Sequence, residues 1–317
     1  MYTAIIILNY NNANDTINCV ESIMKFNTAN VKLIVVDNGS SKGDTVLVLH
    51  EYFSKKFIGN YLRVQDEQIS TVSLPLLTFD VSGENSGYAR GNNKGLSLAY
   101  RDSEIGYIMI LNNDTLFVDD IIPKLLSYLC RLDNCAVVTP VLYKKDGKTM
   151  DKSFARNVHT VNQLILKYIT LGFRIPGLYS KILGPASDIL IKHPDLLKND
   201  FFEVNCISGS CFLIDKTTMQ SIGGFDPNTF LYYEEYILSK KIERIAKKNY
   251  VIPSAKLIHL GGSTAKHYSQ FTTKANLESA NYFLTNYANP NAIQKILFRV
   301  AYWMMRTKIA ILGIWNK

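Results

Sequence analysis

The stretch TAIIILNY, residues 3–10, carries the pattern from which the fold can be predicted. It is a nearly continuous run of apolar and β-branched residues, which is typical of a strand covered on both faces. KLIVVDNGS, residues 32–40, repeats the pattern, and residues 15–26 between them have apolar side chains at helical spacing, with Asn14 as the expected cap. A strand, a helix and a second strand in this order predict two parallel strands joined by a right-handed crossover.

Polar residues follow both strands. Asn9 and Asn11 lie at the end of the first strand, and Asp37 lies at the end of the second. Ligands of parallel sheets bind beyond the carboxyl ends of the strands, so we expect these residues near a ligand. No Gly-x-Gly-x-x-Gly follows the first strand, and Gly-x-x-x-x-Gly-Lys occurs nowhere in the sequence. These two observations argue against a dinucleotide-dependent oxidoreductase and a P-loop enzyme.

A further strand, expected at residues 106–111, runs into the stretch ILNNDT, residues 110–115. This stretch places Asn112, Asn113 and Asp114 at the strand end without an obvious counter-charge nearby in the sequence. A buried carboxylate needs hydrogen bonds, a counter-charge or a metal to remain ionised. The stretch therefore predicts a ligand.

The rest of the pattern alternates helices and strands. We expect helices at residues 45–56 and 118–131 and a strand at 136–143, followed by loops and short helices. The segment ENSGYARGNNKG, residues 84–95, leads into a helix through Tyr100. Its glycines fit either a surface turn before a helix or backbone brought close to a ligand, and their spacing leaves both interpretations open.

The charge of the chain points to an anionic partner. The 317 residues carry a net charge of +8, and no Asp or Glu occurs from Ser279 onward. Nucleic acid, an anionic membrane and a phosphorylated small molecule are all polyanions. Because no RNA-binding or helix-turn-helix signature accompanies the basic residues, we expect no nucleic acid and favour a phosphorylated ligand or a membrane surface.

Five ordered pieces of the sequence carry a family resemblance. They are IIILNYNN (5–12), IVVDNGSS (34–41), ENSGYARGNNKG (84–95), ILNNDT (110–115), and GGFDPNTFLYYEE (223–235) followed by LIHLGGST (257–264). Together they resemble family 2 glycosyltransferases of the GT-A fold, particularly the rhamnosyltransferase-like members that build bacterial surface polysaccharides. The resemblance implies an α/β fold with a Rossmann-like, mostly parallel central sheet flanked by helices, and a C-terminal helical extension.

The resemblance implies a divalent metal site at ILNNDT. The family usually has Asp-x-Asp there, and its Asn-x-Asp variant maps onto Asn112, Asn113 and Asp114. Asp114 would bind Mg²⁺ or Mn²⁺, which are hard ions that favour oxygen ligands and bridge a nucleoside diphosphate. His259 matches a late histidine of the family that reaches the same metal or the diphosphate, although a histidine at a strand end is more often structural.

The resemblance also implies the residues of the substrate pockets. Asp37 would contact the base or ribose, unless it only forms the turn before Asn38. Arg90 would hold phosphate oxygens with its planar guanidinium. Asp226 would contact acceptor hydroxyls, although an Asp before Pro227 is equally natural as a turn residue. The implied nucleotide-sugar-binding residues are Asn9, Asn11, Asp37, Asn85, Arg90, Asn112 and Asn113.

Glycosyl transfer calls for a general base that deprotonates the acceptor hydroxyl. Family members commonly have Glu-Asp at the place of the two glutamates in LYYEEY, residues 231–236, which maps the base onto Glu235 and leaves Glu234 as a rival. The ordinary alternative is a pair of solvated carboxylates at a helix start. Ile237 and Lys241 replace an Asp and an Arg of the family, which puts the donor-side contacts in question.

The resemblance divides the chain into two parts. We expect a GT-A domain at residues 1–265, with a nucleotide-sugar-binding half at 1–115 and an acceptor and catalytic half at 116–265. Residues 266–317 would form a basic helical extension.

Residues 291–315 of this extension are predicted to form a helix with one basic stripe, made by Lys295, Arg299 and Arg306. Charges interrupt its apolar run, so an interfacial helix fits better than a spanning one. We favour membrane contact over packing on the catalytic domain for its apolar residues, which are Leu297, Val300, Trp303, Met304 and Ile311.

These features together imply an inverting, metal-dependent glycosyltransferase that moves a sugar from a nucleoside diphosphate onto a lipid-linked glycan of an O-antigen, capsule or cell wall. Rhamnose from dTDP-rhamnose is the first expectation, and a hexose or galactofuranose from a UDP-sugar is the alternative. A catalytically silent nucleotide-sugar-binding or scaffold protein would bind nucleotide without turnover. The first apolar run is too short for a leader, so we expect a cytoplasmic, peripheral location on the inner face of the plasma membrane.

Overall fold

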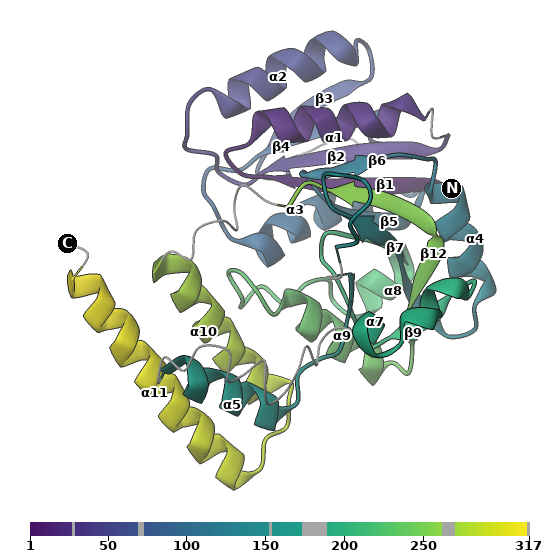
Figure 1. Cartoon of the computed structure of the whole chain (residues 1–317). Helices are drawn as coiled ribbons and strands as arrows, with labels where there is room; N and C mark the ends of the chain where they lie inside the picture. The colour runs from purple at the N-terminus through teal and green to yellow at the C-terminus, as the bar shows by residue number, and fades with distance from the viewer. Residues whose placement is uncertain (27–28, 69–72, 152–153, 173–188, 262–269, 316–317) are drawn as a thin grey trace.

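The computed structural model describes residues 1–26, 29–68, 73–151, 154–172, 189–261 and 270–315 (Figure 1). Within them, ten strands form one sheet in the order β3-β4-β2-β1-β5-β11-β7-β12-β6, with β9 added beside β12. The strands are β1 (Tyr2–Asn9), β2 (Val31–Asp37), β3 (Tyr61–Gln65), β4 (Leu77–Val81), β5 (Ile105–Asn112), β6 (Thr115–Phe117), β7 (Cys135–Tyr143), β9 (Phe202–Val204), β11 (Cys211–Asp215) and β12 (Lys248–His259).

Neighbouring strands from β3 to β5 in this order, and the β7–β12 pair, run parallel. β1 pairs in parallel with both β2 and β5, β4 lies parallel to both β2 and β3, and β12 lies parallel to β7. β11 runs antiparallel between β5 and β7, and β6 and β9 are antiparallel to β12. The predicted α/β fold with a mostly parallel sheet is confirmed.

Helices cover the sheet and extend beyond it (Figure 1). A short second sheet pairs β8 (Ala155–Arg156) with β10 (Cys206–Ile207). The helices are α1 (Ala13–Lys25), α2 (Thr45–Lys56), α3 (Tyr88–Arg101), α4 (Ile122–Arg131), α5 (Val161–Gly172), α7 (Ile189–Lys192), α8 (Lys216–Ser221), α9 (Glu234–Arg244), α10 (Gln270–Asn286) and α11 (Ala292–Trp315), with a 3₁₀ turn at Pro194–Lys198.

The predicted strand–helix–strand unit is present, and its register aligns the polar ends of both strands, because Asn9 pairs with Asp37. One detail of the prediction is wrong. Asn12, not Asn14, caps α1, and its side chain accepts a hydrogen bond from the Asp15 backbone N–H at 3.2 Å. The helix begins at Ala13, so Asp15 is the third helical residue, whose N–H has no partner within the helix.

The glycines of ENSGYARGNNKG bring α3 close to the sheet. A Cβ at Gly91 would lie 2.6 Å from Leu8 Cδ1, and a Cβ at Gly95 would lie 2.5 Å from Ile6 Cγ2. Both neighbours belong to β1, so these two glycines allow close helix–strand packing. Gly87 differs, because its φ of 86° is accessible mainly to glycine and a Cβ there would meet the Phe230 carbonyl oxygen at 2.3 Å.

A second apolar cluster joins the C-terminal helices to the middle of the chain. α11 buries Phe298, Ala301, Met305 and Ile309 against α5 and α10. The same cluster includes Tyr233, which directly precedes α9. This packing connects the predicted extension with a helix that precedes residue 265. The predicted domain boundary itself falls in 262–269, outside the described residues.

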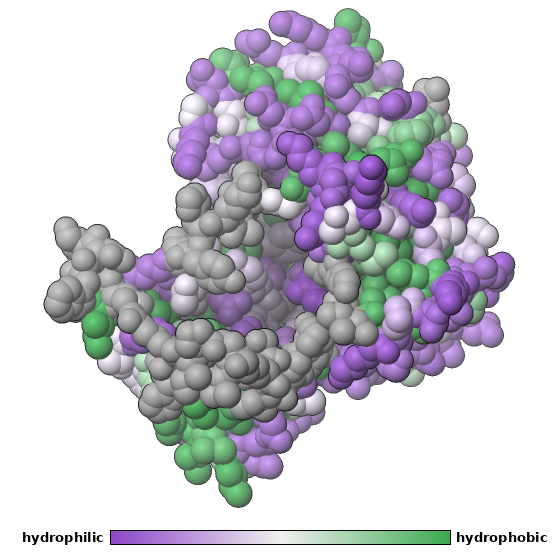
Figure 2. All heavy atoms as spheres, in the orientation of Figure 1, coloured by the Kyte–Doolittle hydropathy of each residue, from purple (hydrophilic) through white to green (hydrophobic). Residues whose placement is uncertain are grey.

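The other face of α11 is exposed. Its exposed apolar side chains include Ile293, Ile296, Leu297, Val300, Trp303 and Ile311. In Figure 2, hydrophobic residues gather at the lower edge of the molecule, where Figure 1 shows the start of α11. Among the helices of the described part of the chain, none is long and apolar enough to cross a membrane.

Candidate active site

The carboxyl ends of β1 and β2 are joined by a buried polar network. Asp37 is fully buried, and its carboxylate accepts hydrogen bonds from Asn9 Nδ2 at 2.6 Å and from Ser40 Oγ at 2.6 Å. Asn11, in the left-handed region at φ 56°, accepts from the Ser41 and Lys42 backbone N–H groups. Asp37 and Asn11 therefore shape the loops around the strand ends, and their contact with a nucleotide stays a prediction.

The loop before α3 is tied to the same sheet edge. Asn38 donates to Asn85 Oδ1 and to the Gly87 carbonyl oxygen, both at 3.0 Å. Its own Oδ1 accepts from Ser86. These bonds hold the glycine-rich loop against β2 and bring Asn85 to the sheet edge.

The amides of ILNNDT have different surroundings. Asn113 donates to Thr16 Oγ1 at 3.0 Å and to Asn9 Oδ1 at 3.3 Å, so its side chain extends the buried network. The Asn112 backbone N–H bonds to the Ser210 carbonyl oxygen at 2.9 Å. Asn112 lines the two cavities described below.

Asp114 has a cationic neighbour that the sequence separates from it by more than a hundred residues. Asp114 is buried, and its Oδ1 lies 3.4 Å from Nε2 of His259, at the end of β12. The other ring nitrogen, Nδ1, lies 2.7 Å from Asp151 Oδ2. Burial alone disfavours the charged ring, but the two carboxylates outweigh it and raise the pKa of His259 to about 9. A proton on His259 thus supplies the positive charge that Asp114 needs.

This pair also fits a divalent cation. Ligand bonds of about 2.1 Å place neighbouring ligands of Mg²⁺ about 3 Å apart, close to the separation of the two atoms. Hydrogen bonding of the second ring nitrogen to a carboxylate is the usual support for a metal-binding histidine, and Asp151 provides it. Among the described side chains, no group of three or more His, Cys, Asp and Glu could hold a metal. A cation here would take its remaining ligands from substrate and water.

Two adjoining cavities open at this edge of the sheet. The strand-end cavity has a volume of about 510 Å³ and is lined by Asn38, Asn85, Asn113, Asp114 and the aromatic residues Tyr10, Phe230 and Phe271. The helix-side cavity, of about 430 Å³, is lined by both glutamates of LYYEEY and by residues of β8, of α5 and of the loop between β10 and β11. Figure 2 shows the viewed face hollowed between the part with the sheet and the part with α10 and α11. Both cavities include Tyr88, Asn112, Leu231 and His259.

The two glutamates follow a strained turn. Tyr232 and Tyr233 have φ of 72° and 70°, a region that bulky residues rarely adopt. Such strain, costing about 1–3 kcal/mol per residue, concentrates at functional sites. The turn starts α9 with Glu234 and Glu235 in its first turn.

The environments of the two glutamates differ. Glu235 is partly exposed to the helix-side cavity, where its Oε1 accepts hydrogen bonds from Arg156 Nη2 and the Gly209 N–H, both at 3.4 Å. Glu234 is buried, and its Oε1 has no hydrogen-bond partner among the described atoms. Burial, reinforced by the nearby charge of Glu235, raises the pKa of Glu234 to about 8. Glu234 is therefore mostly protonated at neutral pH.

Arg90 and Asp226 line neither cavity, and the same holds for Asn9, Asn11 and Asp37. Arg90 is exposed, and its Nε donates to the Pro227 carbonyl oxygen at 2.8 Å. Asp226 is buried and accepts hydrogen bonds from Tyr282 at 3.0 Å and Tyr287 at 2.5 Å. These bonds tie the Asp226 loop to the C-terminal helices, so the contacts support structural roles. Substrate contacts for Arg90 and Asp226 stay predictions.

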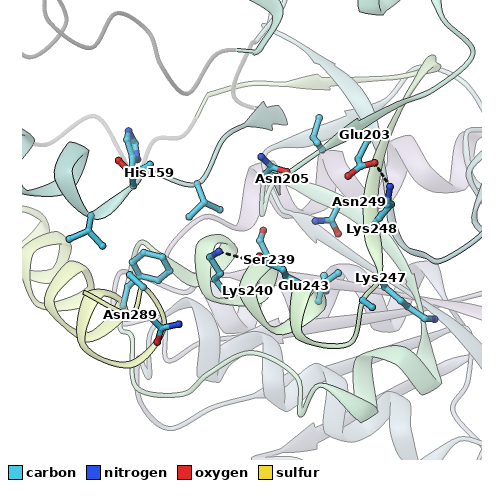
Figure 3. A pocket seen from close by; sticks show the side chains of 18 of the residues that line it. His159, Glu203, Asn205, Ser239, Lys240, Glu243, Lys247, Lys248, Asn249 and Asn289 are labelled. Atoms are coloured by element: carbon cyan, nitrogen blue, oxygen red, sulfur yellow. Dashed lines mark hydrogen bonds and ion pairs between the residues drawn. The ribbon is translucent and has the colours of Figure 1, made fainter. Parts of the chain in front are cut away.

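A third cavity, of about 740 Å³, lies along the outer face of α9 (Figure 3). Its lysines are neutralised by neighbouring carboxylates. Lys240 Nζ lies 2.6 Å from Glu243, and Lys248 Nζ lies 2.7 Å from Glu203. His159 lines both this cavity and the helix-side cavity.

The sequence of most of the sheet matches a known family. The description "Glycosyl transferase family 2" applies to residues 4–220, more than half of the chain. The chain belongs to glycosyl transferase family 2. The resemblance implied by the five motifs is confirmed.

Curated relatives of this family 2 chain are distant. It is 21% identical over 240 residues to N-acetylglucosaminyl-diphospho-decaprenol L-rhamnosyltransferase of Mycobacterium tuberculosis, covering 72% of this chain and 66% of that protein. It is 23% identical over 154 residues to the low-salt glycan biosynthesis hexosyltransferase Agl10 of Haloferax volcanii, covering 49% of this chain and 42% of the relative. The chain thus spans under two thirds of the length of the relatives it matches.

A solved structure supports the fold of the family 2 chain. GalNAc-T7, solved with UDP, GalNAc and Mn²⁺, superimposes with a TM-score of 0.61 at 13% identity, over 96% of this chain and 56% of that one. At this identity the similarity establishes a shared fold, the GT-A fold, and no more.

Several residues at the site were not predicted from the sequence. Asp151, Arg156 and Lys167 lie in a segment whose sequence has little periodic pattern. Tyr88 lines both cavities and donates to the Gly209 carbonyl oxygen at 2.7 Å. Tyr88 stands inside ENSGYARGNNKG, where an aromatic residue among small polar ones was a usable signal.

Proposed function

We propose that this chain is an inverting, metal-dependent glycosyltransferase that moves a sugar from a nucleoside diphosphate to a hydroxyl of a lipid-linked glycan. One observation carries the proposal. The Asp114–His259 pair lines the strand-end cavity, Glu235 lines the helix-side cavity, and the two cavities meet at Tyr88 and Asn112. A donor in the first cavity and an acceptor in the second would meet where the two cavities join.

Asp114 and His259 would hold Mg²⁺ or Mn²⁺. The ion, when bound, neutralises the negative charge that develops on the leaving diphosphate. The amides of Asn38 and Asn85 and the aromatic side chains of Tyr10 and Phe271 would bind the nucleotide in the same cavity. Membership of the family and the Mn²⁺ in the solved structure of GalNAc-T7 support the use of a divalent metal.

Glu235 would take the proton from the acceptor hydroxyl as the hydroxyl oxygen attacks the anomeric carbon. Its carboxylate faces the helix-side cavity and is oriented by Arg156 and the Gly209 N–H. Glu234 suits this role less well, because a buried acid with a pKa of about 8 is mostly protonated at neutral pH.

The names of two relatives support the choice of donor and acceptor. A rhamnosyl donor such as dTDP-rhamnose is favoured because a matching relative is named as a rhamnosyltransferase acting on N-acetylglucosaminyl-diphospho-decaprenol. A hexose from a UDP-sugar remains the second candidate, because the other relative is named as a hexosyltransferase. The name of the rhamnosyltransferase supports a prenyl-diphosphate-linked acceptor, and the name of the hexosyltransferase supports a role in glycan synthesis.

Such an acceptor would bring the enzyme to a membrane surface on the cytoplasmic side. The exposed apolar face of α11 supports this location, since it carries Ile296, Val300 and Trp303 beside the exposed cations Arg299 and Arg306. A helix with this distribution binds in the plane of an anionic membrane interface.

Calorimetric titration of UDP, dTDP and GDP, with Mn²⁺ and then with EDTA, tests the proposal. We expect one nucleotide to bind in a metal-dependent manner and Asp114→Ala to abolish that binding. Nucleotide binding without sugar transfer to any prenyl-diphosphate-linked glycan would favour the catalytically silent alternative. No binding of any nucleotide by a folded sample would contradict the assignment of the strand-end cavity.

A further inference from the structure

Two cations line the helix-side cavity, and the transfer reaction described above uses neither directly. Arg156 comes from β8, and Lys167 comes from the middle of α5. The Nζ of Lys167 lies 5.4 Å from the centre of the Tyr168 ring and 5.8 Å from that of Tyr233. The cation therefore sits beside the strained turn that leads to Glu235.

Lys167 differs from the other lysines near α9. In the third cavity, Lys240 and Lys248 each form an ion pair with a glutamate, as the dashed lines in Figure 3 show. Among the described residues, no carboxylate lies within ion-pair distance of Lys167. Arg156 Nη2 lies 3.4 Å from Glu235 Oε1, so its charge is partly compensated, in contrast to that of Lys167.

Without a bound ligand, the positive charge of Lys167 is disfavoured by burial and by the nearby charge of Arg156. Burial, together with the charge of Arg156, lowers the pKa of Lys167 to about 8. Burial and both cations lower the pKa of the neighbouring His159 to about 4, so His159 adds no charge at neutral pH. An anion bound between the two cations would relieve their repulsion.

We propose that Arg156 and Lys167 bind a phosphate or diphosphate group of the acceptor, separate from the diphosphate of the donor. The proposal rests on the proposed function, because it gives that reaction's acceptor a binding site. Neither cation lines the strand-end cavity, where Asp114 would place the donor diphosphate. The acceptor anion lies instead on the Glu235 side, where the reacting hydroxyl must lie.

The position of α5 suits an acceptor anion that is carried by a lipid. α5 packs against α11, and the other face of α11 exposes its apolar side chains. A prenyl chain held at a membrane on that face would have its diphosphate near the helix that carries Lys167. This geometry accounts for a cation on α5 rather than on the sheet.

The test is calorimetric titration of farnesyl diphosphate into the full chain in EDTA, which removes metal-dependent binding at the donor site. Lys167→Gln is compared with the wild type and with Lys240→Gln, a control lysine that is already neutralised by Glu243. We expect the wild type and Lys240→Gln to bind equally, and Lys167→Gln to bind about tenfold or more weakly, as for a lost charged hydrogen bond.

Two further ligands distinguish binding of the diphosphate from binding of the prenyl chain. Farnesol should bind all three proteins equally weakly, and inorganic pyrophosphate should show the same dependence on Lys167 as farnesyl diphosphate. Equal affinity of all three proteins for farnesyl diphosphate would overturn the proposal. So would farnesol binding as tightly as farnesyl diphosphate, because the contact would then be apolar only.

Nucleotide titration in Mn²⁺ keeps this proposal separate from the proposed function. We expect Lys167→Gln to bind the nucleotide as the wild type does. A parallel loss of nucleotide affinity in Lys167→Gln would assign the cation to the donor diphosphate and overturn the acceptor site. A wild type that binds no nucleotide would count against the proposed function, whatever farnesyl diphosphate does.

Discussion

The Nδ1 atom of His259 lies 2.7 Å from a carboxylate oxygen of Asp151. This contact fixes the orientation of the imidazole ring, so that Nε2 points toward Asp114. Asp151 does not itself line either of the two adjoining cavities. It therefore acts on the candidate metal site through His259.

Asp151→Asn should weaken Mn²⁺ binding by about 10- to 100-fold, because loss of a carboxylate behind a metal-binding histidine removes its orientation and basicity. Mn²⁺ affinity, measured by electron paramagnetic resonance with saturating nucleotide, is the readout. Asp195→Asn is the matched control, since Asp195 is exposed and its one ion-pair partner among the described residues is Lys198. Equal Mn²⁺ affinity in Asp151→Asn and the control would refute the positioning role.

Glu235→Gln should lower kcat by about 10²- to 10⁴-fold, the usual contribution of a general base. Glu234→Gln should change kcat far less, because an amide resembles the protonated acid that burial favours at this position. The two variants are compared in one transfer assay, with nucleotide affinity measured in parallel. A normal kcat in Glu235→Gln would exclude Glu235 as the base, and a large loss in Glu234→Gln would shift the role to Glu234.

Glu234 should make the protein less stable as the pH rises. Its pKa increases from 4.5 to about 8 on folding, so the folded state holds a proton that the unfolded state has already lost between these values. The free energy of unfolding therefore falls across this interval. Glu234→Gln lacks this dependence, and its advantage over the wild type should grow by up to a few kcal/mol from pH 5 to pH 8. Urea unfolding at both pH values measures this difference, which a pH-independent offset would contradict.

Gly91→Ala should destabilise the fold by about 1–3 kcal/mol, as expected for overpacking. The added methyl group would lie 2.6 Å from Leu8 Cδ1 and 3.1 Å from the Asn38 side chain, so either these side chains or α3 must shift. Gly83→Ala is the control, because only one Asp66 oxygen, at 3.9 Å, lies near its added Cβ. The melting temperatures of both variants, measured by thermal unfolding, test this prediction. Equal melting temperatures would show that the structure accommodates the methyl group at Gly91.

Replacing Ile296 and Trp303 together by Ser should reduce binding to vesicles that contain phosphatidylglycerol, while thermal stability stays close to that of the wild type. Both side chains are exposed, at 62% and 61%, so the folded protein loses little packing. Ile58→Ser is the control, because Ile58 is an apolar residue just beyond the end of α2 and is 82% exposed. Co-sedimentation at low and high salt is the measurement. Unchanged vesicle binding in the double variant would exclude this face of α11 as the membrane contact.

The sequence by itself determined four of the strands, β1, β2, β5 and β7, the helices α1 to α4 and α11, and the order of the motifs, because these depend on local periodicity. β1 and β2 are apolar runs that must be buried on both faces, and their polar ends mark the ligand edge of a parallel sheet. Asp114 also carried a usable signal, since a carboxylate at the end of a buried strand requires a partner.

Only the tertiary structure decided which partners meet. His259 and Asp151 are 108 residues apart, and Arg156 and Glu235 are 79 apart, and no local pattern links residues at such separations. Burial likewise distinguishes the adjacent Glu234 and Glu235, because both line the helix-side cavity but Glu234 is buried and Glu235 is partly exposed. Periodicity reports which face of an element is apolar, whereas charge, protonation and ligand geometry depend on what another part of the chain brings to that face.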